Sequence, residues 1–240
     1  SRIKQIVLNK IRPRTRDEQE ISGYKNVLAM IEESYNDIVV SKNHILQLHS
    51  ELFKPTSKPF GGKFKSVQNY IVATLANGAQ QVLFTPPSPF ETPIMVEQLT
   101  EEFNKVKPYE VEPLILIANF ILDFLCIHPF NDGNGRMSRL LTTLLLLKFD
   151  FKVAKYISIE RIIEQTKEYY YDSLALSDQG WEKNENDPTP FIKYILQVIL
   201  LAYREFASKL TFDPKAKNIY DQVKKIIDEI LGKFTKQTIM

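Results

Sequence analysis

Apolar residues recur at intervals of three and four along most of the chain, which is the spacing of amphipathic helices. This spacing predicts helices over residues 17–37, 94–106, 156–176 and 191–206, with Ser41 as the N-cap of another. Residues 111–127 are apolar on nearly every side and should form the central buried helix, with residues 140–149 packed beside it. The pattern therefore predicts a mostly α-helical fold.

One segment has the composition of a β-strand instead. Residues 80–89 contain the strand formers Val82, Leu83, Phe84 and Thr85, followed by prolines that end the run. We expect a small β-hairpin here. Because an edge strand has unpaired backbone groups, such a hairpin can hold an extended peptide by strand addition, or it can be purely structural.

The chain of 240 residues is long enough for one large domain, which we expect at residues 17–206. Residues 1–16 form a polar, basic N-terminal segment, and residues 207–240 form a lysine-rich helical appendage or the start of a further module. The net charge of +2 is too balanced to predict binding of nucleic acid or of a membrane surface. The single cysteine, Cys126, excludes an intrachain disulfide and fits a reducing compartment, so we expect a cytoplasmic location.

The most unusual stretch lies between the two apolar runs, at residues 128–139. Its glycines, Gly133 and Gly135, lack a Cβ, so the backbone can take a positive φ there and approach a ligand closely. If a helix begins near Arg136, the preceding amides face outward at its positive end, which is an anion site. Arg136 and Arg139 share one face of such a helix and can both reach one chain of phosphates.

Two further side chains of this stretch complete a set for phosphoryl or nucleotidyl transfer. Asp132 would repel phosphate unless a divalent cation lay between them, which makes it a candidate Mg²⁺ ligand. His128 has an ordinary pKa of roughly 6.5 and can accept a proton at neutral pH. A base, a metal ligand, an amide cradle and two guanidinium groups are the parts that such a reaction uses. A calcium-binding EF-hand loop is excluded, because its register would place Phe130 and Leu141 where carboxylates are required.

Residues 128–139 resemble the Fic-family motif, His-Pro-Phe-x-Asp/Glu-Gly-Asn-Gly-Arg-x-x-Arg, and agree with it at every defined position. The resemblance implies a Fic-like helical bundle with a small β-hairpin flap over the active site. It also implies a protein adenylyltransferase, which moves AMP from ATP to a Ser, Thr or Tyr hydroxyl of a target protein or of itself. The alternatives are transfer of another phosphate-containing group, such as UMP or phosphocholine, and a catalytically dead interaction module.

The resemblance also implies a role for each residue of the motif. His128 would deprotonate the incoming hydroxyl, and Asp132 would hold the Mg²⁺ that bridges the α- and β-phosphates. The phosphates of ATP would be bound by Gly133, Asn134, Gly135, Arg136 and Arg139. Residues 82–85 of the flap would hold the target protein. Tyr170 and Tyr171 resemble a tyrosine pair near the nucleobase in the family, although aromatic residues at helical spacing more often pack in a core.

Two features depart from the common family pattern. Lys65 stands where the family often has Arg in a short loop element, and a solvated lysine is the alternative reading. Many Fic proteins also carry an inhibitory helix with the pattern Ser/Thr-x-x-x-Glu-Gly/Asn, whose Glu pairs with the last Arg of the motif. No Ser or Thr of this sequence has Glu four residues later. We therefore expect the inhibitory helix to lie upstream of Ser1, to lie on another protein or to be missing, and we expect this chain to be constitutively active. The target protein and the oligomeric state stay open.

Overall fold

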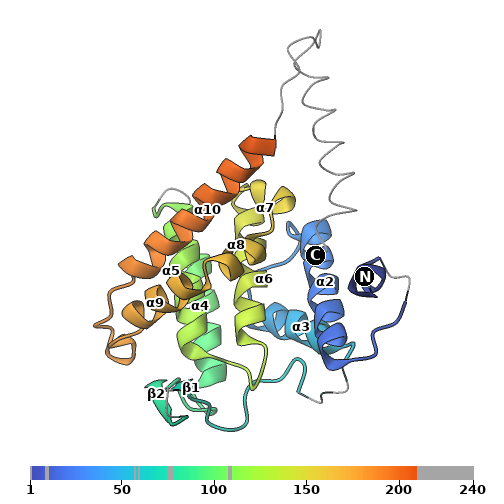
Figure 1. The fold of residues 1–240 in the computed structure, drawn as a ribbon. Helices are drawn as coiled ribbons and strands as arrows, with labels where there is room; N and C mark the ends of the chain where they lie inside the picture. The colour runs from blue at the N-terminus through green and yellow to red at the C-terminus, as the bar shows by residue number, and fades with distance from the viewer. Residues whose placement is uncertain are drawn as a thin grey trace.

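The structure, a computed structural model, describes residues 2–8, 11–56, 58, 60–74, 78–107 and 110–209. In chain order, the elements of these residues are α1 (Arg2–Val7), α2 (Arg16–Ser34), α3 (Lys42–Phe53), β1 (Ile71–Thr74), β2 (Gln80–Phe84), α4 (Thr92–Lys105), α5 (Pro113–Ile127), α6 (Asn134–Lys148), α7 (Val153–Tyr156), α8 (Ile159–Gln165), α9 (Lys167–Ser177), the 3₁₀-helix η1 (Trp181–Lys183) and α10 (Thr189–Lys209). Helices dominate, and β1 and β2 form a small antiparallel sheet (Figure 1). The predicted fold class is therefore confirmed.

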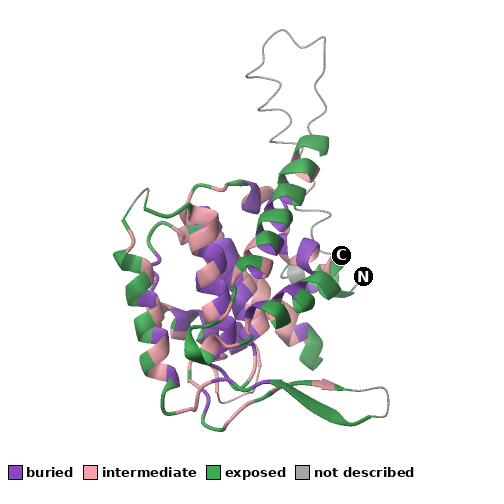
Figure 2. Ribbon diagram, turned by 90° about the vertical axis from the view of Figure 1, so that its left-hand side faces the viewer, coloured by how far each residue is buried: buried purple, intermediate pink, exposed green. Residues whose placement is uncertain are grey.

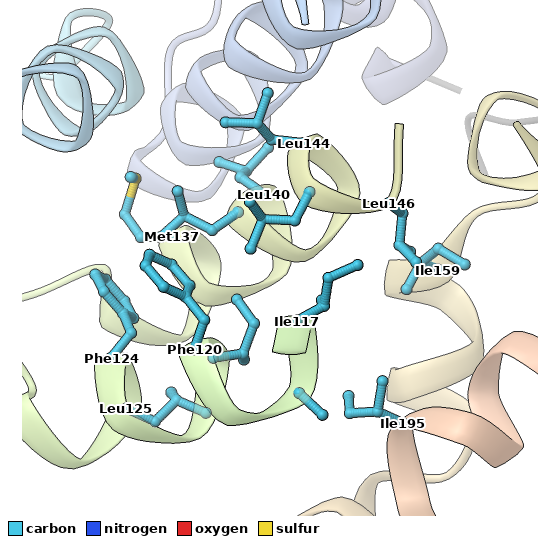
Figure 3. Close-up of a cluster of buried hydrophobic side chains, with 14 of the residues drawn as sticks. Ile117, Phe120, Phe124, Leu125, Met137, Leu140, Leu144, Leu146, Ile159 and Ile195 are labelled. Atoms are coloured by element: carbon cyan, nitrogen blue, oxygen red, sulfur yellow. The ribbon is translucent and has the colours of Figure 1, made fainter. Parts of the chain in front are cut away.

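Helices α5 and α6 pack against each other at the centre of the molecule and carry a large part of its core (Figure 1). Figure 3 shows this contact for Phe120 and Phe124 of α5 and for Met137 and Leu140 of α6, all of them buried. Helices α4 and α10 cover α5, whereas α2 packs against α6. Neighbours on several sides are what a helix needs when it is apolar on nearly every side, because each exposed CH₂ group costs about 0.8 kcal/mol. The prediction of a central buried helix is confirmed.

The turn between α5 and α6 contains the sequence motif. Helix α6 begins at Asn134, close to Arg136, near which a helix start was considered, and ahead of the apolar run at residues 140–149. Gly133 is its N-cap residue and has a φ of +90°, in the left-handed region. A Cβ at this position would lie 2.8 Å from a ring carbon of Phe53 on α3. Both the backbone angle and the neighbouring ring therefore require glycine at residue 133.

The single helix predicted over residues 156–176 is wrong, because α7, α8 and α9 divide this region. Ser158 has an extended backbone, and its hydroxyl accepts the Arg161 N–H at 3.2 Å, so a new helix starts there. Thr166 ends α8 with a φ of −115°, and its hydroxyl donates to the Ile162 carbonyl at 2.8 Å. These local side-chain hydrogen bonds interrupt a stretch whose apolar spacing is continuous.

The predicted β-hairpin is present at the same end of the molecule as the turn between α5 and α6 (Figure 1). Its two strands pair in antiparallel fashion, with Val72 opposite Val82, and most of its surface is exposed (Figure 2). Leu83 and Val82 are exposed, whereas Phe84 is buried against the helical body. Thr85 follows the last residue of β2 and is exposed. The hairpin is therefore anchored at one end and accessible along the rest of its length.

Helix α10 ends at Lys209, so almost all of the predicted C-terminal appendage at residues 207–240 lies outside the described residues. The division of the chain into an N-terminal segment, a domain and an appendage stays a prediction. Cys126 is buried on α5. Among the helices of the described ranges, none has both the length and the apolar character needed to cross a bilayer.

Candidate active site

His128 ends α5 in a left-handed backbone conformation, with a φ of +47° and a ψ of +60°. Its Nδ1 lies 3.3 Å from the carbonyl oxygen of Leu125, which can only accept, so Nδ1 carries the proton in this contact and Nε2 keeps its lone pair. Burial lowers the pKa of His128 to about 4, and the nearby charge of Lys65 acts in the same direction. The imidazole is therefore neutral at pH 7 and able to accept a proton through Nε2.

Two buried side chains hold the turn that follows His128. Asn134 accepts the Phe130 N–H at 2.9 Å and donates to the Phe130 carbonyl at 2.7 Å. His49 of α3 places Nε2 3.0 Å from the Asp132 carbonyl and stacks its ring on Phe130 at 3.6 Å between centroids. The Asn134 amide is thus occupied by the turn itself. A contact of this side chain with phosphate would require these bonds to open, and its phosphate role stays a prediction.

The N-terminus of α6 has the features of an anion site. Its first backbone N–H groups have no acceptor within the helix, and they form the positive end of the helix dipole. Gly133 is required by the backbone, but Gly135 lies within α6, where the nearest atom to an added Cβ is Arg139 Nη1 at 3.5 Å. Packing therefore does not require glycine at residue 135. Its missing side chain leaves the helix end open, as a bound phosphate would need.

Asp132 lies among cationic side chains just before α6. Its Oδ1 accepts from Arg136 Nη2 at 3.0 Å, and its Oδ2 accepts from Lys58 Nζ. Arg16 Nη2 lies 3.8 Å from the same Oδ2. Burial opposes ionisation of this carboxyl, but the hydrogen bond from Lys58 and the charge of Arg136 outweigh it and lower the pKa of Asp132. Asp132 is therefore an ionised carboxylate that attracts positive charge.

The carboxylate of Asp132 fits a Mg²⁺ site only together with a nucleotide. In the part of the chain that the structure describes, no three His, Cys, Asp or Glu residues are grouped to hold a metal ion. At nucleotide sites Mg²⁺ commonly takes one or two carboxylates and completes its shell with phosphate oxygens and water. Asp132 offers one such carboxylate beside the phosphate-binding end of α6. It would be the protein ligand, and the phosphates of ATP would supply further oxygens.

Arg136 faces carboxylates on two sides. Beyond its bond to Asp132, its Nη1 lies 3.2 Å from Glu20 Oε2, which comes from α2. Within the described residues, this Nη1 is a buried side-chain nitrogen without an aligned hydrogen bond, because Glu20 is close but poorly oriented. Arg136 therefore retains donor capacity for an incoming oxyanion.

Arg139 lies one turn further along α6 and donates from Nε to Glu160 Oε2 on α8 at 2.6 Å. Tyr24 of α2 donates its hydroxyl to the same oxygen at 2.7 Å. Burial raises the pKa of Tyr24 well above its usual value, so this hydroxyl stays a donor. A carboxylate thus pairs with Arg139 although the sequence lacks the inhibitory pattern. The expectation of constitutive activity stays a prediction.

The two tyrosines expected near the nucleobase lie in different surroundings. Tyr170 is buried, and its ring centroid lies 5.6 Å from that of Tyr194 and 6.0 Å from that of Phe191. Tyr171 is 55% exposed. The nucleobase contact stays a prediction for both residues, and Tyr171 is the one whose ring is accessible in this conformation.

Sequence analysis missed the side chains that other segments bring to the motif. Lys58 precedes Asp132 by 74 residues, Glu160 follows Arg139 by 21, and Glu20 lies on α2. Charged residues of this kind look like solvated surface in a sequence, so no local signal identifies them. The reading of Lys65 as a solvated lysine is wrong, because its side chain is buried.

Residues 39–146 match the model of the Fic/DOC family. Among curated proteins, the chain is 29% identical over 160 residues to "Protein adenylyltransferase Fic" of Culex quinquefasciatus, covering 67% of this chain and 27% of that protein. It is 28% identical over 180 residues to the protein of the same name in Drosophila mojavensis, covering 75% of this chain and 32% of that protein. The chain thus spans about a quarter to a third of the length of these relatives.

Two solved structures have a similar fold. A Fic family protein from Desulfovibrio desulfuricans aligns with a TM-score of 0.69 and 21% identity, over 96% of this chain and 68% of that one. A Fic domain containing signaling protein from Bacteroides thetaiotaomicron aligns with a TM-score of 0.62 and 21% identity, over 84% of this chain and 78% of that one. At this level of identity the similarity establishes the fold alone.

Proposed function

Because residues 39–146 match the model of the Fic/DOC family, we propose that this chain transfers AMP from ATP to a hydroxyl group of a protein. One observation carries the proposal: a neutral imidazole, His128, ends α5, and the short turn that follows it leads into the N-terminal part of α6, which bears Arg136 and Arg139. A base and an anion site are thereby adjacent. The adenylyltransferase names of the curated relatives support the same reaction.

In this reaction the hydroxyl proton passes to Nε2 of His128 while the hydroxyl oxygen attacks the α-phosphorus of ATP. The bond from the α-phosphorus to the oxygen that bridges it to the β-phosphate breaks, and pyrophosphate leaves. Because the pKa of His128 is lowered to about 4, the imidazole is a weak base before attack. It therefore accepts the proton as the new P–O bond forms, when the hydroxyl becomes acidic.

The other end of the motif binds the phosphates. The N-terminal amides of α6 and the guanidinium groups of Arg136 and Arg139 stabilise the negative charge that accumulates on the leaving pyrophosphate. Mg²⁺, when bound, would neutralise phosphate charge beside Asp132. Arg139 donates to Glu160, so binding of ATP requires an exchange of partners there, whereas Arg136 retains donor capacity on Nη1.

The hairpin is the proposed site for the target protein. Its two strands pair only with each other within the described residues, so each has an outer edge with free backbone groups. A segment of the target can add to such an edge and present its hydroxyl to His128, with Val82 and Leu83 exposed beside it. Because Cys126 is the single cysteine of the chain, we further propose that the protein acts in a reducing, cytoplasmic environment.

Labelled ATP tests the proposal. The chain is incubated with a cell extract and with ATP labelled at either the α- or the γ-phosphate. Transfer of the α label alone is the expected result, transfer of the γ label would identify a kinase, and no transfer would favour an interaction module. His128→Ala should transfer the label at least about 100-fold more slowly than the wild type. Mass spectrometry of the purified chain after incubation with ATP then shows whether it also modifies itself.

A further inference from the structure

The segment between α3 and β1 contacts the turn after α5 through four consecutive backbone carbonyls. Lys65 and Asn69 of this segment donate to the carbonyl oxygens of residues 127–130. The four bonds run from Lys65 Nζ to Ile127 at 3.0 Å, from Asn69 Nδ2 to His128 at 3.1 Å, from the Lys65 N–H to Pro129 at 2.9 Å and from Asn69 Nδ2 to Phe130 at 3.2 Å. Lys65 Nζ also donates to Asn69 Oδ1 at 2.9 Å, which links the two side chains. We call Lys65 and Asn69 the carbonyl clamp.

The carbonyl clamp acts on the one residue of this turn whose backbone is strained. His128 has a φ of +47°, and a residue with a Cβ loses about 1 to 2 kcal/mol in the left-handed region. Such a conformation persists only where the surrounding structure over-determines it. Bonds to the carbonyls on both sides of His128 supply that constraint, and they fix the direction in which its imidazole leaves the backbone.

The charge of Lys65 also lowers the pKa of His128. Its side chain is buried, and burial lowers the pKa of Lys65 to about 8, while the charge of Glu91 opposes the shift. The ammonium is therefore still charged at pH 7. A fixed cation near the imidazole disfavours a second positive charge there, so Lys65 acts on the charge of His128 as well as on its position.

We propose that Lys65 and Asn69 are positioning residues for AMP transfer, which hold the imidazole of His128 in the orientation in which it accepts the hydroxyl proton. This inference rests on the proposed function for its link to transfer. The geometry itself concerns the free protein. Neither residue is expected to touch ATP, because the phosphates bind at the other end of the motif.

Kinetics of two variants test the positioning role. Asn69→Asp keeps the size of the side chain and an acceptor for Lys65 but loses the donor to the two carbonyls, and Lys65→Met removes the ammonium. In both variants kcat should fall roughly 10- to 100-fold, as misplacement of a reacting group by about 1 Å does, with the KM for ATP within about twofold of the wild type. Lys65→Arg, which keeps the charge and the donors, should restore most of the rate. Lys63→Met, which removes an exposed lysine of the same loop, is the matched control and should change neither constant.

A measurement that needs no activity separates this inference from the proposed function. NMR titration of the histidine rings should show a higher pKa for His128 in Lys65→Met than in the wild type or in Lys63→Met. The titration is informative even if the chain transfers no AMP. In that case the proposed function is rejected, but the titration still tests whether Lys65 affects His128.

The inference is overturned if Lys65→Met and Asn69→Asp stay folded with unchanged kcat and an unchanged His128 titration. If both variants fail to fold, Asn69→Ser supplies the test. The serine hydroxyl is still a hydrogen-bond donor, but the shorter side chain brings it less close to the carbonyls of His128 and Phe130. A loss of kcat in Asn69→Ser that is smaller than the 10- to 100-fold loss expected above, with an unaltered KM for ATP, supports the positioning role. A kcat equal to that of the wild type rejects it.

Discussion

The two ends of residues 128–139 are held in place by different means. At the His128 end, Lys65 and Asn69 bond to backbone carbonyls, and the imidazole is left with a free lone pair. At the other end, Arg136 and Arg139 are held through their own side chains, by the carboxylates of Asp132 and Glu160. Hydrogen bonds to the backbone carbonyls leave the imidazole of His128 available, whereas the carboxylates occupy donors of the guanidinium groups.

This difference teaches which end must rearrange when a nucleotide binds. A phosphate chain competes with carboxylates for the same guanidinium donors, but it does not compete for the bonds that hold backbone carbonyls. We infer that the base is already in position before ATP arrives, whereas Arg139 must exchange Glu160 for phosphate oxygens. Substitutions at the two ends should therefore separate turnover from ATP affinity.

The largest effect is expected at the His128 end. His128→Ala removes the base and should lower kcat roughly 10²- to 10⁴-fold, the usual contribution of a general base. Affinity for ATP, measured by calorimetry, should stay within about twofold of the wild type, because the arginines are untouched. A parallel loss of ATP affinity would show that the two ends are not independent.

As the pH falls, the buried imidazoles of His49 and His128 should destabilise the fold at a higher pH than the one at which Asp132 becomes protonated. Burial lowers the pKa of His49 and of His128 to about 4, so both are neutral in the folded state. As the pH falls below roughly 6.5, the two histidines bind protons in the unfolded chain but not in the folded chain, and the free energy of unfolding decreases. Between pH 6.5 and 5 the loss is about 2 kcal/mol for each imidazole, and it levels off below pH 4.

Urea unfolding at a series of pH values measures this loss. His49→Gln, which can still donate to the Asp132 carbonyl, should reduce the slope of stability against pH in this window by about half. An unchanged slope in His49→Gln would mean that folding does not lower the pKa of His49.

Removal of Arg139 should act on the affinity for ATP. Arg139→Ala should weaken ATP binding by roughly 10- to 100-fold, because a hydrogen bond to a charged group contributes about 1.5 to 3 kcal/mol. Arg161→Ala is the matched control, since Arg161 pairs with Glu205 away from the motif. Equal affinities of the two variants would contradict the assignment of Arg139 to the phosphates.

The smallest effect is an increase in affinity. Glu160→Gln keeps an acceptor for Tyr24 but removes the charge that competes with phosphate for Arg139, so ATP should bind roughly threefold to tenfold more tightly. Glu164→Gln alters an exposed glutamate of the same helix and should leave affinity unchanged. Weaker binding by Glu160→Gln would show that Glu160 positions Arg139 for the nucleotide.

Local patterns predicted the features that depend on neighbours in the chain. Three- and four-residue spacing predicted the central helix over residues 111–127. β-branched and aromatic residues before prolines predicted the second strand of the hairpin within residues 80–89, whereas its first strand, Ile71–Thr74, was not predicted. The long helix predicted over residues 156–176 failed for a local reason too. Ser158 and Thr166 make hydrogen bonds to nearby backbone that the apolar period does not reveal.

The motif at residues 128–139 was readable because its residue types are rare in combination and adjacent in the chain. Tertiary structure alone decided which groups surround it: Lys65 is buried beside His128, Glu160 faces Arg139, and Tyr170 packs into the core. The physical reason is that helical spacing is encoded within a few residues, whereas a charged side chain gains its partner only when two distant elements pack together. The sequence therefore shows directly which residues share a helix, but it does not show which charged side chains pair across distant elements.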